Sequence, residues 1–88
     1  MNVAFSQDAW NEYCDWPQSD RSAFDKLNTL IEQCRRTPLV GRGKPEPLRG
    51  DLLGWWSRRI TREDRLVYRV TSEGRERTLE IIQCRSHY

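Results

Sequence analysis

The chain has 88 residues, of which 32% are charged and 10% aromatic, and its formal net charge is +2. This length predicts a single domain over residues 1–88, with a thin core in which aromatic side chains supply much of the buried area. No stretch approaches the roughly 18 consecutive apolar residues of a membrane-spanning helix. The start, MNVAFSQDAW, does not follow the pattern of a secretory signal. We therefore expect a cytoplasmic protein with no membrane contact.

The first part of the chain predicts a strand and two helices. Residues 2–6, NVAFS, are typical of a short strand whose last serine can cap a helix. Pro17 is expected to end this first helix, because proline lacks the backbone N–H that the helix needs. A second helix, capped by Ser19 or Asp20, would run to residue 36 with apolar positions at 24, 27, 30, 31 and 34. The expected apolar face of the first helix consists of Trp10, Tyr13, Cys14 and Pro17.

The remaining sequence predicts a loop and three strands. Residues 37–54 hold four glycines and three prolines, which favours a loop. The segments WWSRRIT (55–61), RLVYRVT (65–71) and RTLEIIQC (77–84) favour strands joined by short turns. The fold class is therefore α+β: an N-terminal strand, two helices, then an antiparallel three-stranded meander, with the helices packed on one face of a twisted antiparallel sheet. The other face is left for arginines, while Trp56 and Tyr68 are expected in the core.

Charge is divided unevenly along the sequence. Residues 1–34 hold two basic and six acidic side chains, whereas residues 35–69 hold ten basic and four acidic ones. Nearly all the basic residues are arginines, whose planar fork matches phosphate oxygens. This asymmetry favours a nucleic-acid partner over a set of solvated surface charges.

The cysteines predict neither a disulfide framework nor a metal site. Cys14, Cys34 and Cys84 are odd in number and widely spaced, with no C-x-x-C motif. A zinc site would need all three thiols together with His87, the only histidine. We therefore expect three reduced, buried thiols, no metal and no cofactor.

Two residues suggest acid–base chemistry. Glu46 lies between Pro45 and Pro47, which stiffen the chain, and nearby cations should keep its carboxylate ionised. His87 titrates near neutral pH, at about 6.5 when unperturbed. A carboxylate, an imidazole and an arginine together can cleave RNA through attack of the ribose 2′-OH on the adjacent phosphate. The alternatives are an exposed loop glutamate without a task and a disordered terminal histidine.

Several motifs together resemble the YoeB-type toxins of the RelE superfamily: RRTP, GRGKPEPL, GWWSRRIT, RLVYRVT and the terminal CRSHY. The resemblance covers nearly the whole chain. It implies a fold similar to small microbial ribonucleases and a ribosome-dependent endoribonuclease that cleaves mRNA in the A site and inhibits translation. It also implies a cognate antitoxin that silences the toxin. The implied roles are general base for Glu46, general acid for His87, phosphate stabilisation for Arg65, RNA positioning for Tyr88, and added positive potential for Lys44, Arg49 and Arg59.

Two other functions compete with this one. A non-catalytic RNA- or ribosome-binding module would show the same charge pattern but would not require Glu46 with His87. A DNA-binding regulator would need a groove-reading element, and no helix-turn-helix signature is present. We expect contact with DNA only indirectly, through an antitoxin complex. The sequence leaves open whether the chain forms a homodimer.

Overall fold

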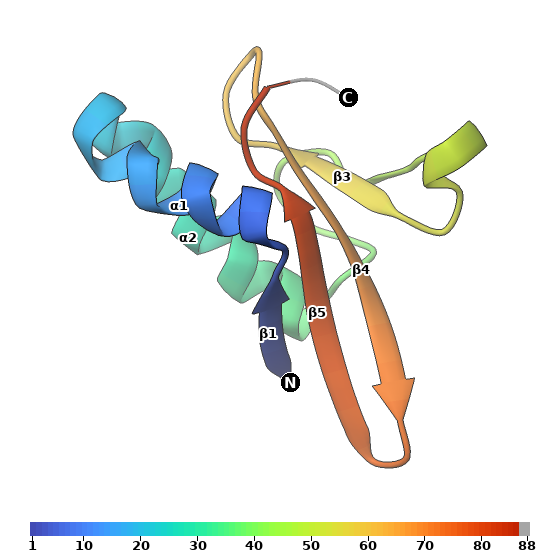
Figure 1. The fold of residues 1–88 in the computed structure, drawn as a ribbon. Coiled ribbons are helices and arrows are strands. Elements are labelled where there is room, and N and C mark those ends of the chain that lie inside the picture. Colours follow the sequence, from blue (N-terminus) through green and yellow to red (C-terminus); the bar gives the residue numbers. More distant parts are fainter. Residues whose placement is uncertain (87–88) are drawn as a thin grey trace.

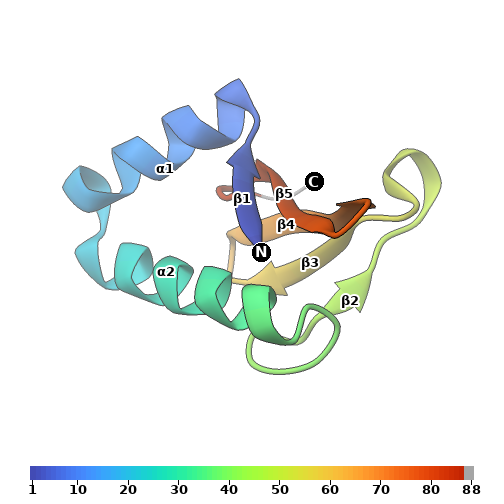
Figure 2. The same ribbon diagram turned by 90° about the horizontal axis from the view of Figure 1, so that it is seen from below.

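The computed structural model describes residues 1–86, which form two α-helices and a five-stranded sheet. Both helices lie on one side of the sheet, so neither helix covers its other face (Figures 1 and 2). Within these residues, neither helix has the length and apolar character needed to cross a membrane. The strands follow the order β1-β5-β4-β3-β2 across the sheet. The elements are β1 (Asn2–Phe5), α1 (Gln7–Ser19), α2 (Arg21–Arg36), β2 (Glu46–Pro47), β3 (Trp56–Arg59), β4 (Arg65–Glu73) and β5 (Glu76–Gln83), with a 3-10 turn at Gly50–Leu52.

The α+β class and the antiparallel meander of β3, β4 and β5 are confirmed. The sheet is mixed rather than antiparallel throughout, because β1 pairs in parallel with β5. A parallel neighbour requires a long connection, which the two helices and the meander provide. The sequence did not predict β2, whose two residues pair with Ser57 and Trp56 of β3. This short strand interrupts the predicted loop and brings Glu46 into the sheet.

The predicted caps at the starts of the two helices are confirmed, but the predicted end of α1 is not. Ser6 caps α1 as predicted, since its hydroxyl accepts the Ala9 N–H at 3.1 Å. Asp20 caps α2 and accepts the Ala23 N–H at 3.0 Å. The prediction that Pro17 ends α1 was wrong, because Pro17 lies inside the helix. Near the C-terminal end, proline removes only one hydrogen bond, so the helix can finish its last turn around it.

Helix α1 buries a different face from the predicted one. Its buried residues are Ala9 and Trp16, while Trp10 is 47% exposed. Cys14 is also exposed, so the prediction of three buried thiols holds only for the other two cysteines. Each helical residue turns by about 100°, which puts Cys14 on the side of the helix away from Trp16. Four other aromatic side chains from the first strand and the two helices form a cluster beside the core: Phe5, Trp10, Tyr13 and Phe24.

The core lies between the helices and the sheet. The predicted stripe of α2 is confirmed, with Phe24 only partly buried at its margin. Tyr68 is fully buried and Trp56 is packed against the core, as expected. The core cluster consists of Ala9, Trp16, Ala23, Leu27, Leu30, Ile31, Cys34, Ile60, Leu66, Tyr68, Leu79, Ile81 and Cys84.

We expect the free energy of unfolding to fall steeply above about pH 9. Burial raises the pKa of Cys34 from 9.0 to about 11 and the pKa of Cys84 from 9.0 to about 12. The unfolded chain releases these protons first, so stability is complete below pH 9 and is lost as pH rises toward 12. Urea unfolding at pH 10.5 should show a loss of about 2 kcal/mol per thiol relative to pH 7.5. Cys84→Ala should weaken the pH dependence of the free energy of unfolding. Cys14→Ser, the control at an exposed thiol, should leave that dependence unchanged. A free energy of unfolding that stays constant between pH 7.5 and 10.5 would contradict the prediction.

Candidate functional site

The candidate site lies on the sheet face turned away from the helices, here called the open face. Leu66 and Tyr68 of β4 belong to the core, and successive side chains of a strand point to opposite faces. Arg65 therefore lies on the open face, and so does Arg59, its direct partner on β3. Glu46 pairs with Ser57, two residues from Arg59, which puts it on the same face. The pairing thus places on one face three of the residues singled out in the sequence.

Two arginines form one end of this site. Arg59 is exposed and Arg65 is half-buried. Like charges directly opposite each other on neighbouring strands repel, so an anion between them would be stabilising. The Nη1 atom of Arg65 also donates to the carbonyls of Thr61, Arg62 and Asp64 at 3.1, 3.2 and 3.1 Å. These bonds hold the guanidinium of Arg65 against the β3–β4 turn.

Glu46 is exposed on β2, beside these arginines. Two strand spacings and two residues separate it from Arg65, a Cα distance of about 12 Å. A phosphodiester can lie in the space between the Glu46 carboxylate and the Arg65 guanidinium. Lys44 precedes β2, and the Gly43 carbonyl accepts the Arg59 N–H at 2.7 Å. The backbone therefore brings Lys44 to the same end of the site as Arg59.

Arg49 lies at the other end of the site. It is exposed at the start of the 3-10 turn that follows β2. About 10 Å of extended chain separates it from Glu46. The structure thus brings Lys44, Glu46, Arg59 and Arg65 together, whereas Arg49 adds positive charge only from a distance.

The chain before the C-terminus is fixed beside Arg65. The Arg65 N–H donates to the Ser86 carbonyl at 3.1 Å, and the Ser86 N–H donates to Asp64 Oδ1 at 2.7 Å. The Gln83 side chain donates to the same Ser86 carbonyl at 3.0 Å. The proposed site residues His87 and Tyr88 lie outside the described residues.

Helix α1 supports the same segment from the other side, which sequence reasoning missed. Both backbone polar groups of Cys84 bond to this helix: its N–H donates to Glu12 Oε1 at 2.9 Å and its carbonyl accepts the Trp16 indole N–H at 2.8 Å. Arg85 lies over the Trp16 ring at 4.3 Å and donates to the Ser19 hydroxyl. No sequence pattern pointed to these contacts, because they join residues more than 60 positions apart.

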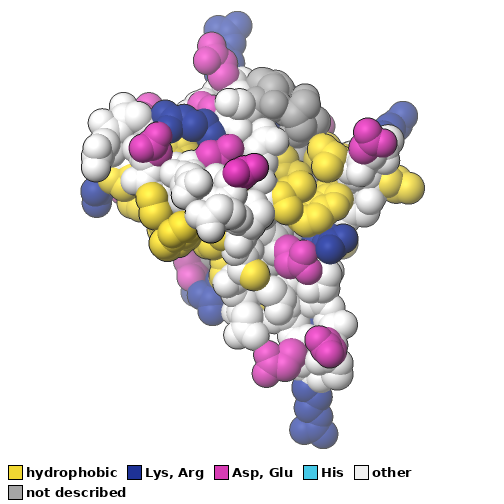
Figure 3. Space-filling model, viewed as in Figure 1, with side chains coloured by type: hydrophobic (Ala, Val, Ile, Leu, Met, Phe, Trp, Pro, Cys, Tyr) yellow, Lys and Arg dark blue, Asp and Glu magenta, His cyan; other side chains and the backbone are white. Residues whose placement is uncertain are grey.

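The open face is less uniformly basic than the sequence suggested. Arg69 forms an ion pair with Glu80 at 3.2 Å and lies over the Trp55 ring at 4.4 Å. The Arg69 guanidinium and the Trp55 ring, which could otherwise contact RNA, are therefore already engaged with protein groups. Figure 3 shows basic and acidic side chains interspersed around a gathering of hydrophobic ones, rather than one continuous basic patch. The free cations of the candidate site are therefore few and local.

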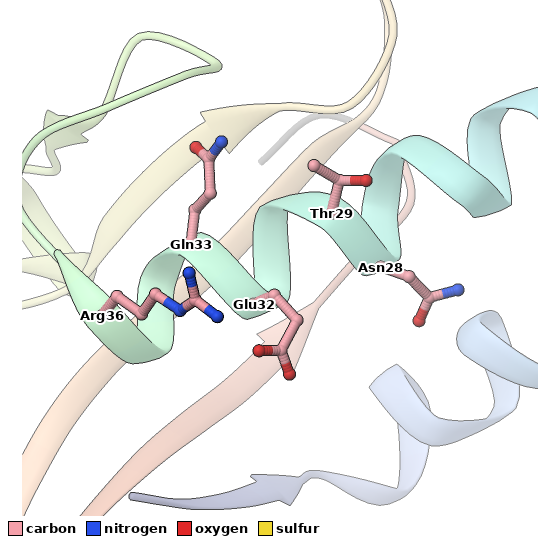
Figure 4. A pocket seen from close by; sticks show the side chains of 5 residues that line it. All are labelled: Asn28, Thr29, Glu32, Gln33 and Arg36. Atoms are coloured by element: carbon pink, nitrogen blue, oxygen red, sulfur yellow. The ribbon is translucent and has the colours of Figure 1, made fainter.

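A second concave feature lies elsewhere. A hollow of about 440 Å³ runs along the outer side of α2, and none of its lining side chains belongs to the open face (Figure 4). The hollow is lined by Asn28, Thr29, Glu32, Gln33 and Arg36.

Among residues 1–86, no group of three or more His, Cys, Asp or Glu side chains is placed to hold a metal ion.

The chain is thus a small α+β domain that displays a carboxylate and arginines on the helix-free face of its sheet. Residues 5–88 match the model of the YoeB-like toxins of bacterial type II toxin-antitoxin systems. The chain belongs to this family, which confirms the resemblance seen in its motifs. It is 48% identical to Toxin YoeB of Escherichia coli K12 and 46% identical to Toxin YoeB of Streptomyces coelicolor, in each case over the whole of both chains.

Solved structures support the same assignment. The YoeB/ParE toxin from Agrobacterium tumefaciens superposes with a TM-score of 0.95 at 50% identity over all of both chains. The YoeB-YefM complex from Staphylococcus aureus matches with a TM-score of 0.87 at 37% identity, covering all of this chain and 98% of the other. A YoeB dimer from Staphylococcus aureus is similar to the same degree, with a TM-score of 0.87 at 38% identity. YafQ from Escherichia coli, at 17% identity and a TM-score of 0.75, shows the shared fold alone.

Proposed function

We propose that this toxin is a ribosome-dependent endoribonuclease that cleaves mRNA in the A site and thereby inhibits translation. The observation that carries the proposal is the convergence of Glu46, Arg59 and Arg65 on the open face. The anchored Ser86 beside them adds support, since His87 follows it in the sequence. A binding module would need the arginines, but it would not need a carboxylate in the middle of an anion site.

In the proposed reaction, Glu46 takes the proton of the ribose 2′-OH. The 2′-oxygen attacks the adjacent phosphorus and forms a 2′,3′-cyclic phosphate as the bond to the 5′-oxygen breaks. His87 gives its proton to that leaving oxygen. Arg65 and Arg59 stabilise the negative charge that develops on the phosphoryl oxygens. All proton transfers use side chains of this protein, so the proposed reaction needs no metal ion.

The remaining residues have supporting roles in this proposal. Lys44 adds positive potential at the arginine end, where the Gly43–Arg59 hydrogen bond holds its backbone. Arg49 adds positive potential from a greater distance. Tyr88 positions the RNA.

We propose three partners in addition to the RNA. The ribosome presents the mRNA, which places the activity in the cytoplasm. A cognate antitoxin silences the toxin, by analogy with the YoeB-YefM toxin-antitoxin complex of Staphylococcus aureus, and provides any contact with DNA. A second copy of the chain is also proposed, because a YoeB of Staphylococcus aureus forms a dimer.

Incubation with translating ribosomes tests the function. The purified toxin should create new mRNA 5′ ends at A-site codons, and Glu46→Gln should abolish them while ribosome binding is retained. The matched control is Glu63→Gln, which removes an exposed carboxylate from the β3–β4 turn and should cleave normally. Ribosome binding without new 5′ ends from the wild-type protein would favour the non-catalytic module instead.

A further inference from the structure

We propose that Arg58 is a positioning residue: its buried guanidinium fixes the loop of residues 37–44 and thereby sets where Glu46 stands on the open face. This inference rests on the proposed function and adds a residue to it that does not touch RNA. Arg58 and Arg59 are adjacent on β3 but point to opposite faces of the sheet. The first is fully buried and the second is exposed.

A buried cation requires an explanation, because desolvating a charge is costly unless it is fully hydrogen-bonded. Arg58 forms no ion pair with an acidic side chain among residues 1–86. Its guanidinium instead donates to backbone carbonyls of the loop: those of Val40 at 2.9 Å, Arg42 at 3.3 Å and Thr37. The loop therefore supplies the compensating dipoles, and the cation in turn holds three loop carbonyls.

Two other side chains tie this arrangement to α2 and β4. The Nε atom of Arg58 donates to the Tyr68 hydroxyl at 3.1 Å, and that hydroxyl donates to the Pro38 carbonyl. Gln33 Oε1 accepts from Arg58 Nη1 at 3.4 Å and from the Arg42 N–H at 3.1 Å. The loop is thus bonded to the helix before it and to two strands of the sheet through one guanidinium.

The loop closes around Arg58 at two glycines. Gly41 has φ +125°, and a Cβ there would lie 3.1 Å from Arg58 Nη1. Gly43 has φ +82°, and a Cβ there would lie 3.1 Å from the Arg58 Cβ. Glycine tolerates these positive φ angles and leaves room for the arginine. Such close contact means that the path of the loop follows the Arg58 side chain, with Gly41 against its guanidinium and Gly43 against its Cβ.

This path leads directly into the site. Gly43 accepts the Arg59 N–H at 2.7 Å, and Glu46 follows three residues later on β2. Loss of the guanidinium would leave the loop carbonyls without donors, and the start of β2 would shift. A displacement of about 1 Å in a catalytic group can lower a rate by roughly 100-fold. The two arginines proposed to hold RNA, Arg59 and Arg65, would stay in place, because β3 and β4 pair independently of the loop.

Arg58→Lys tests the inference, since it keeps the charge and loses the planar fork. We expect kcat for ribosome-bound mRNA cleavage to fall about 10–100-fold, while the half-saturating ribosome concentration changes less than about 3-fold. The Arg42 amide should exchange with solvent faster than in the wild type, and the Asp20-capped Ala23 amide should not change. The matched control is Leu79→Ala, which removes buried volume from β5 and should lower stability without a comparable loss of kcat.

Wild-type kcat in Arg58→Lys, or a loss no larger than that of Leu79→Ala, would overturn the inference. So would an unchanged exchange rate of the Arg42 amide. If the wild type cleaves no RNA, the proposed function fails, and the amide exchange alone decides whether Arg58 fixes the loop. If Arg58→Lys does not fold, Tyr68→Phe takes its place, because it removes the hydroxyl between Arg58 and Pro38 and is judged by the same two measurements.

Discussion

Replacing Arg65 with alanine is expected to lower the single-turnover rate of mRNA cleavage by about 10²–10³-fold, because a donor aimed at the developing charge is lost. The fold should persist. Arg65 keeps its backbone pairing with Arg59, and its N–H can still donate to the Ser86 carbonyl in the variant. Only the side-chain bonds to the β3–β4 turn disappear with the guanidinium. The rate is measured at saturating ribosome concentration, so that weaker binding does not contribute.

Two controls separate charge from geometry in this experiment. Arg62→Ala removes an exposed cation from the same turn and should leave the rate nearly unchanged. Arg65→Lys keeps the charge at the site but not the planar fork, and its rate should lie between those of the wild type and Arg65→Ala. A near-wild-type rate for Arg65→Ala would remove Arg65 from the proposed mechanism.

Deleting His87 and Tyr88 is expected to give a folded protein that no longer stops growth when overproduced. A positioned general acid contributes about 10²–10⁴-fold in rate, and that contribution would vanish with His87. The described contacts of the preceding chain remain, since Cys84 bonds to α1 and Ser86 bonds to Asp64 and Arg65. Thermal unfolding should therefore stay cooperative. Growth of the overproducing strain and cleavage on purified ribosomes are the two measurements.

The point variant His87→Gln separates the acid from the rest of the tail. It should reproduce most of the loss in cleavage while the chain keeps its full length. A truncated protein that remains toxic would exclude a catalytic role for the tail. If the truncated protein fails to unfold cooperatively, the tail is structural, and the rate of His87→Gln alone decides whether His87 acts as the acid.

Local sequence patterns were sufficient to predict those features that depend only on residues within one helix or strand. The stripe of α2, the Ser6 and Asp20 caps and the three strands of the meander depend on side-chain period and on hydrogen bonds within a few residues. The expectation that arginines occupy the face away from the helices holds for Arg65, which alternates in β4 with Leu66 and Tyr68 of the core. Glu46 was identified by its motif and its flanking prolines, without knowledge that it lies in a strand.

Only the tertiary structure decided which neighbours these elements meet. The parallel pairing of β1 with β5 and the short β2 depend on contacts between distant segments, which no local period encodes. In α1, Trp16 is buried instead of Trp10, and its indole N–H donates to the carbonyl of Cys84, 68 residues away. The same holds for the adjacent arginines of β3. Strand alternation puts Arg58 and Arg59 on opposite faces of the sheet. It does not predict that the loop from α2 folds over one face and encloses Arg58, while Arg59 stays exposed on the open face.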